Sequence, residues 1–127
     1  MFKHFSRQDP RLNFRVRQPD PRIHFALVCA SRTCPPIEVY EAENLNRQLD
    51  TSAQVFINST TQLNKTRQVL KLSEIFRWYR RDFNLHGLAL PHYLADYLYD
   101  RENAKWLKQH AEKLRIHYEP YDWRLNR

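Results

Sequence analysis

Residues 22–28 read RIHFALV, a nearly continuous apolar run that only His24 interrupts. Such a run is typical of a strand buried on both faces in the middle of a sheet. Pro35 and Pro36 follow shortly after, and because proline has no N–H to donate, the strand must end before them. Small and polar residues at 29–34 therefore occupy the C-terminal end of the strand, where sites are commonly built in helix-covered sheets.

Periodic patterns after this run predict helices and two shorter strands. The best helix spans 42–57, where apolar residues recur every three or four positions. Further helices are predicted over 73–83 with Ser73 as cap, from Pro91 onward, and after a cap at Asp100; short strands are predicted at 67–72 and 114–118. Strands separated by helices predict an α/β or α+β domain, with a small mixed sheet, a central buried strand at about 22–28, and about four packing helices.

The chain of 127 residues has the size of one domain. Its prolines break any helix near the N-terminus, so we expect an extended arm over 1–19 and a single domain over 20–127. The arm is basic, since residues 1–22 carry six Lys or Arg against two Asp, or +4 of the total +7. A basic arm can contact phosphates, but it is more often a solvated chain end, so nucleic acid is not the expected partner.

Composition excludes several classes of protein. The single glycine, Gly87, excludes the glycine-rich loops of dinucleotide and nucleotide sites and the nucleophile elbow of α/β-hydrolases, so no cofactor is predicted. No apolar run approaches the ~20 residues that span a bilayer, and no secretory h-region is visible. We therefore expect a cytoplasmic protein without membrane contact.

Two cysteines in the segment after the apolar run are the main candidates for chemistry. A thiol beside a cation can ionise and become nucleophilic, so Cys29 or Cys34 is a candidate nucleophile. Arg32 lies between them and could stabilise a thiolate or, with Ser31, bind an anionic substrate. The alternative for Cys29 is a small core residue at the end of a buried strand. Cys34, in a loop beside Pro35, is expected to be the more accessible thiol.

A catalytic thiol needs an imidazole within hydrogen-bond reach. His24 lies five residues before Cys29, which in a strand places the two on opposite faces about 17 Å apart. The partner must then be one of four other histidines: His86, His92, His110 or His117. A Cys29–Cys34 disulfide is sterically allowed but is not expected to be permanent in the cytoplasm. The C-x4-C spacing without a second pair does not predict a metal site.

Two aromatic segments have competing interpretations. Arg77 and Arg81 lie one helical turn apart beside Trp78, a pattern that could stack on bases but more often is a solvated edge of a packed helix. The C-terminal stretch with Tyr121 and Trp123 is expected to pack down as a clasp rather than form a site.

The stretch DPRIHFALVCASRTCPPI at 20–37 resembles the signature of the domain of unknown function 547 family, with scattered similarity as far as residue 126. This family has no settled activity, and some eukaryotic members have Asp where Cys34 stands. Bacterial members usually begin with an apolar helix and a Glu-His element that are not found here. The resemblance thus implies a C-terminal portion of the domain, with a site that is incomplete or completed by a partner chain. A missing helix would leave an apolar face uncovered and favour self-association.

Two functions remain open on this evidence. The first is a thiol pocket of hydrolase-like or acyl-transfer character, with Cys34 or Cys29 as nucleophile. The second is a binding or scaffold domain without chemistry, which the lack of a visible complete acid–base set favours. Whether the chain is an enzyme is not decided by its sequence.

Overall fold

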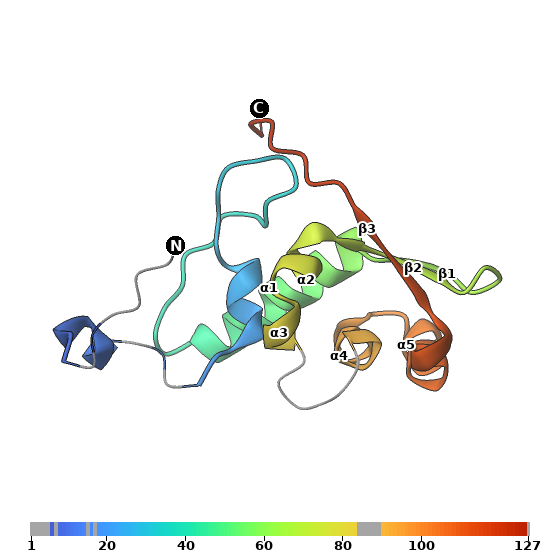
Figure 1. Cartoon of the computed structure of the whole chain (residues 1–127), viewed down its shortest axis with the longest axis horizontal. Helices are drawn as coiled ribbons and strands as arrows, with labels where there is room; N and C mark the ends of the chain where they lie inside the picture. The colour runs from blue at the N-terminus through green and yellow to red at the C-terminus, as the bar shows by residue number, and fades with distance from the viewer. Residues whose placement is uncertain (1–5, 7, 15, 17, 84–89, 127) are drawn as a thin grey trace.

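The protein has a mixed α/β fold, which confirms the predicted class (Figure 1). The computed structural model describes residues 1–127 except 1–5, 7, 15, 17, 84–89 and 127. The elements in order are η1 (Pro10–Phe14), η2 (Pro21–Phe25), α1 (Leu45–Thr60), β1 (Gln62–Asn64), β2 (Val69–Ser73), α2 (Glu74–Trp78), α3 (Arg80–Phe83), α4 (Leu90–Tyr97), α5 (Arg101–His110), η3 (Ala111–Lys113) and β3 (Arg115–Glu119).

The three described strands form a sheet in the order β1-β2-β3. β2 pairs antiparallel with β1 and parallel with β3, so the sheet is mixed as predicted. Leu70 and Leu72 of β2 are fully buried, whereas Lys71 between them is exposed. The central strand of the sheet is therefore the one that the sequence predicted at 67–72 as a short strand.

The prediction of a buried strand at 22–28 is wrong. Pro21–Phe25 is a 3-10 helix, η2, which begins where the Asp20 side chain accepts a hydrogen bond from the backbone N–H of Arg22. Proline at the first position supplies the helical φ angle without losing a needed donor. An apolar run alone does not distinguish a buried strand from a helical turn, and here the local cap decides. Leu27 and Val28, beyond the turn, are 63% and 40% exposed.

Phe25 anchors η2 to the core. Its ring lies 5.1–5.7 Å, centroid to centroid, from the rings of Phe56, Phe76 and Phe83, which come from α1, α2 and α3. The Arg22 guanidinium adds ion pairs to Asp20 and to Asp50 of α1, at 2.6 and 2.8 Å. These contacts fix the chain immediately before the cysteines.

Two of the predicted N-caps begin helices, α2 and α5. Ser73 accepts from the N–H of Ile75, and Asp100 accepts from the N–H of Asn103, as the sequence predicts. The helix predicted over 73–83 is divided at Tyr79, so Arg77 and Arg81 do not share one continuous helix.

The N-terminal segment also departs from its predicted extended form, because residues 10–14 make the 3-10 helix η1. Among the residues that the structure describes, no helix has the length and apolarity to cross a bilayer.

Candidate active site

The segment 29–34, called here the cysteine loop, is held by the C-terminal end of the chain. Arg32 N donates to the carbonyl of Arg124 at 2.9 Å, and Asn126 N donates to the carbonyl of Ala30 at 3.0 Å. Ser31 and Leu125 form an antiparallel bridge between the two segments. Figure 1 shows the C-terminal segment running from β3 to lie beside this loop. Residues nearly a whole chain apart therefore build one site.

The cysteine loop folds back on itself. Ala30 has φ 60°, a left-handed value that costs a non-glycine residue about 1 kcal/mol or more. Cys34 N donates to the carbonyl of Ser31 at 3.1 Å, which closes a turn. As a result the Cys34 sulfur accepts a hydrogen bond from Cys29 N at 2.8 Å. The loop thus brings both thiols to one place.

Both cysteines line a cavity of about 200 Å³. Cys29 is exposed and Cys34 partly exposed, so the expected order of accessibility is reversed. The reason is that no buried strand ends at Cys29, because the chain leaves the core at Phe25. The other lining residues are mostly apolar or aromatic: His24, Leu27, Val28, Pro35, Ile75, Trp78, Tyr79, Tyr121 and Trp123.

Two hydroxyl groups contact the Cys29 thiol. Its sulfur lies 3.2 Å from Ser31 Oγ and 3.3 Å from Tyr121 Oη, and Ser31 Oγ donates to Tyr121 Oη at 2.9 Å. Hydrogen bonds from the Ser31 hydroxyl, then the Tyr121 hydroxyl, the Ser31 N–H and Cys34 lower the pKa of Cys29 to about 6. When Cys29 ionises, the Ser31 hydroxyl can rotate from Tyr121 to the sulfur.

Tyr121 is suited to remain the donor to this thiolate. Burial, followed by its hydrogen bond to Cys29, raises the pKa of Tyr121 to about 12. The phenol therefore keeps its proton at neutral pH while Cys29 loses its own. With the phenol protonated and the thiol ionised, the negative charge lies on the Cys29 sulfur.

His24 lines the same cavity as the cysteines, although the sequence placed it and Cys29 on opposite faces of a strand, too far apart to pair directly. That prediction assumed a strand, whereas the chain turns in η2 and comes back. Nε2 of His24 is 2.8 Å from Asp82 Oδ2, and the ring stacks on Tyr79 at 3.7 Å. Nδ1 is buried and has no hydrogen-bond partner among the described residues. The histidine is thus oriented by a carboxylate, with one ring nitrogen unused.

The three described histidines among the predicted partners lie elsewhere. His110 stacks on Trp106 at 4.1 Å, and His117 lies on β3 beside a different cavity. His92 belongs to α4, and His86 is outside the described residues. None of the three described ones lines the thiol cavity.

The other two predicted site residues have different surroundings. Ser31 is buried and supports the Cys29 sulfur directly. Arg32 is exposed and does not line the thiol cavity, although its backbone holds the loop to the C-terminal segment. Its anion-binding role stays a prediction.

Sequence reasoning missed two functional candidates. Asp82 contacts His24 from 58 residues away, and Tyr121 contacts Cys29 from 92 residues away. No local pattern marks either one. The expectation that the C-terminal aromatics form a clasp agrees with the ring contacts of Trp78 with Tyr121 and Trp123, at 4.9 and 5.7 Å, but the clasp is also part of the site.

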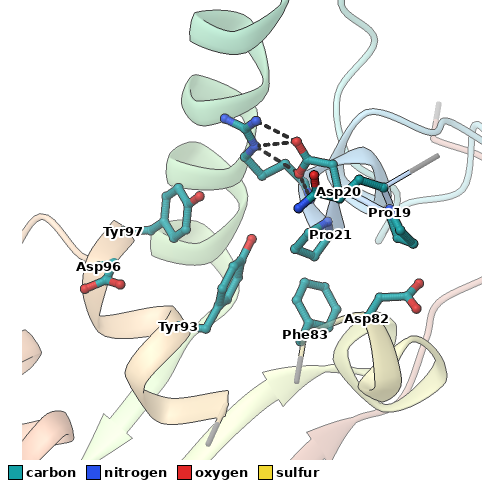
Figure 2. A pocket seen from close by; sticks show the side chains of 10 residues that line it. Pro19, Asp20, Pro21, Asp82, Phe83, Tyr93, Asp96 and Tyr97 are labelled. Atoms are coloured by element: carbon teal, nitrogen blue, oxygen red, sulfur yellow. Dashed lines mark hydrogen bonds and ion pairs between the residues drawn. The ribbon is translucent and has the colours of Figure 1, made fainter. Parts of the chain in front are cut away.

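A larger cavity, of about 580 Å³, lies next to this site (Figure 2). Tyr93 and Tyr97 lie on one side of Phe83 and Asp82 on the other, and Asp20 at its edge binds Arg22. Neither cysteine lines it. Asp82 therefore joins the two cavities, since it lines the larger one and binds the histidine of the smaller.

The candidate site on this mixed α/β fold combines a cysteine, two hydroxyl groups and a histidine–carboxylate pair. No group of three His, Cys, Asp or Glu in the described part of the chain could hold a metal ion. The family model described as "Protein of unknown function, DUF547" matches residues 1–57, which confirms the resemblance over that part of the chain and is consistent with a fragment of a DUF547 domain. The match includes both cysteines and His24 but not Asp82 or Tyr121. No curated protein and no solved structure matches the chain.

Proposed function

We propose that this protein transfers or hydrolyses an acyl group through a covalent intermediate on Cys29. The observation that carries the proposal is the position of the Cys29 sulfur, hydrogen-bonded to Ser31 and Tyr121 on the wall of a cavity that His24 also lines. A stabilised thiolate beside an oriented imidazole is the arrangement that nucleophilic cysteine catalysis requires. Cys34 is the less suited nucleophile, because its sulfur is bound to Cys29 N within the loop.

The first half of the reaction forms an acyl-enzyme. The Cys29 thiolate attacks the carbonyl carbon of an ester, thioester or amide, and a carbon–sulfur bond forms as the bond to the leaving group breaks. The leaving group needs a proton, which His24 can supply. Asp82 Oδ2 binds Nε2 and orients the ring, so Nδ1 is the nitrogen left to exchange the proton.

The second half releases the acyl group. Water or an acceptor attacks the thioester carbon, His24 takes the proton, and Cys29 leaves again as thiolate. The low pKa of Cys29 assists this step because a weakly basic sulfur is a better leaving group.

The cavity wall indicates the kind of acyl group. Leu27, Val28 and Ile75, together with Trp78 and Tyr79, line the cavity of about 200 Å³. An apolar wall favours an apolar group, and the volume limits its size. We therefore propose a short apolar acyl chain as the preferred substrate part.

The test uses p-nitrophenyl esters of increasing chain length with the full chain. We expect a burst of nitrophenol, an intact-mass increase equal to one acyl group, and its location on Cys29. Cys29→Ser should abolish the burst. Tyr121→Phe should weaken it, while Tyr99→Phe, which changes an exposed tyrosine elsewhere, should not. Release of nitrophenol that is unchanged in Cys29→Ser, with no acyl adduct, would overturn the proposal.

The rival is a binding domain without chemistry, and one observation favours it. Apolar side chains around the cysteine loop are exposed, namely Leu27 at 63%, Trp123 at 67% and Leu125 at 59%. Exposed apolar groups in one region are typical of binding surfaces. A chain that forms no acyl-enzyme but self-associates, with association weakened by Leu125→Ser, would establish this rival instead.

A further inference from the structure

We propose that Cys29 and Cys34 form a dithiol that a hydroperoxide oxidises to an intramolecular disulfide, and that a dithiol reductant restores. The inference stands on the geometry of the cysteine loop and does not depend on acyl transfer. It assigns a covalent modification site and the class of its oxidant.

The positions of the two sulfur atoms carry this inference. Cys34 Sγ is 2.8 Å from the backbone nitrogen of Cys29 and 3.8 Å from the carbonyl oxygen of Leu27. Only Cα and Cβ separate that nitrogen from the Cys29 sulfur, and the Cys34 side chain also hydrogen-bonds to the Cys29 thiol, so the two sulfurs are near neighbours. A disulfide needs this proximity before it can form without backbone movement. The turn from Ser31 to Cys34 and the left-handed Ala30 maintain it.

The two thiols differ in solvent exposure, and this difference assigns their roles. The more exposed one reacts with the oxidant, and the other forms the disulfide with it. Cys29 is exposed, so a small oxidant reaches its sulfur from solvent. Ser31 Oγ and Tyr121 Oη lie 3.2 and 3.3 Å from that sulfur, where their hydrogen bonds favour its ionised form. Reactive redox cysteines are accessible, ionise readily and lie next to a resolving cysteine. Cys34, partly exposed beside it, fits the resolving role.

The first step oxidises Cys29. Its thiolate attacks the terminal oxygen of the hydroperoxide, a sulfur–oxygen bond forms, and the oxygen–oxygen bond breaks. The sulfur loses two electrons, and the alkoxide or hydroxide that leaves takes a proton to become an alcohol or water. The product on Cys29 is a sulfenic acid.

The second step forms the bridge. The Cys34 sulfur attacks the Cys29 sulfur, the sulfur–sulfur bond forms and the sulfur–oxygen bond breaks. Hydroxide leaves and combines with the Cys34 proton as water. In sum, two thiols and one hydroperoxide give one disulfide, one alcohol or water, and one further water.

The test oxidises the reduced full chain with one equivalent of hydrogen peroxide and no acyl substrate. Intact mass spectrometry should show the loss of two hydrogen atoms without dimerisation, reversed by dithiothreitol. Trypsin cleaves after Arg32, between the cysteines, so the bridged chain should release the two adjoining peptides as one linked species. In Cys34→Ser, dimedone should instead trap a sulfenic acid on Cys29. In Cys29→Ser, the remaining thiol should stay reduced over the same period.

Two results would overturn this inference. One is a wild-type chain that keeps both thiols, or that oxidises only to intermolecular dimers. The other is accumulation of sulfinic acid on Cys29 while Cys34 stays reduced. Because no acyl substrate is present, either result would leave the acyl-transfer proposal to its own test.

Discussion

The core around η2 and the cysteine loop are adjacent in the chain but differ in what holds them. Phe25 is 1% exposed and packs in a cluster of phenylalanines, whereas Cys29, four residues later, is exposed. The core is stabilised by burial of apolar surface, and the loop by hydrogen bonds to the C-terminal segment. Stability and reactivity should therefore respond to different substitutions, even within one short segment.

The largest expected effect is on the core side. Phe25→Ala should reduce the free energy of unfolding by about 3–5 kcal/mol, because it leaves a cavity among Phe56, Phe76 and Phe83. Urea denaturation measures this change. The matched control is Phe14→Ala, since Phe14 is 89% exposed and should change stability by less than about 0.5 kcal/mol. Equal effects of the two would show that η2 does not belong to the core.

The next largest effect concerns His24, which belongs to η2 and also lines the cavity of the cysteine loop. His24→Asn should lower the rate constant of acyl-enzyme formation by about 10²-fold or more, because it removes the side chain proposed as the proton donor. His117→Asn changes an exposed histidine on β3 and should leave that rate unchanged. Rapid-mixing measurement of nitrophenol release gives both rates. A rate in His24→Asn equal to that of the control would remove His24 from the proposed mechanism.

A third prediction concerns the pH dependence of the loop. The rate of alkylation of Cys29 by iodoacetamide should rise with pH around a midpoint near 6, the pKa of the folded thiol. Tyr121→Phe removes one hydrogen bond to the thiolate and should raise the midpoint by about one pH unit, the lower end of the range for charged groups because Cys29 is exposed. Tyr99→Phe should not move it. A midpoint near 8.5 in the unmodified chain would mean that the thiol is not activated.

The same low pKa has a consequence for stability. The folded thiol has a pKa of about 6 and the unfolded one about 8.5, so the unfolded chain binds more protons between these values. Stability from this group is therefore fully present above about pH 8.5 and is lost as the pH falls through 6. Solvent exposure of Cys29 keeps the size of this contribution small. Urea titrations at several pH values should show the trend in the unmodified chain and less of it in Cys29→Ser.

The two regions also differ in how far the sequence predicted them. The amphipathic helix at 42–57 is found as α1, Leu45–Thr60, and the strands at 67–72 and 114–118 are found as β2 and β3. These succeeded because apolar period and end caps are local signals. RIHFALV failed because it has no period, and the Asp20 cap gives it a helical turn. Because His24 lies in that segment, the wrong strand prediction also placed it too far from Cys29 to be considered as its partner.

The side-chain contacts of the candidate site could not be predicted from local sequence patterns. Tyr121 reaches Cys29 across 92 residues, and Asp82 reaches His24 across 58. Such pairs are fixed by the packing of the whole fold rather than by spacing. The cysteine loop itself was predicted from its small and polar residues, and both thiols do line a cavity.

The smallest expected effect tests how the C-terminal segment holds the loop. Thr33 Oγ1 accepts from Asp122 N at 2.9 Å and donates to the Asp122 carbonyl at 3.2 Å. Thr33→Val keeps the side-chain shape and removes both bonds, so it should cost about 1–2 kcal/mol at this contact. Because Tyr121 is the neighbour of Asp122, its hydroxyl should then be held less firmly against Cys29. We expect faster amide exchange in the C-terminal segment and a small upward shift of the alkylation midpoint. Thr51→Val is the control, since its hydroxyl donates to the Arg47 carbonyl within α1. Faster exchange with an unmoved midpoint would show that the segment clasps the loop without setting the reactivity of its thiol.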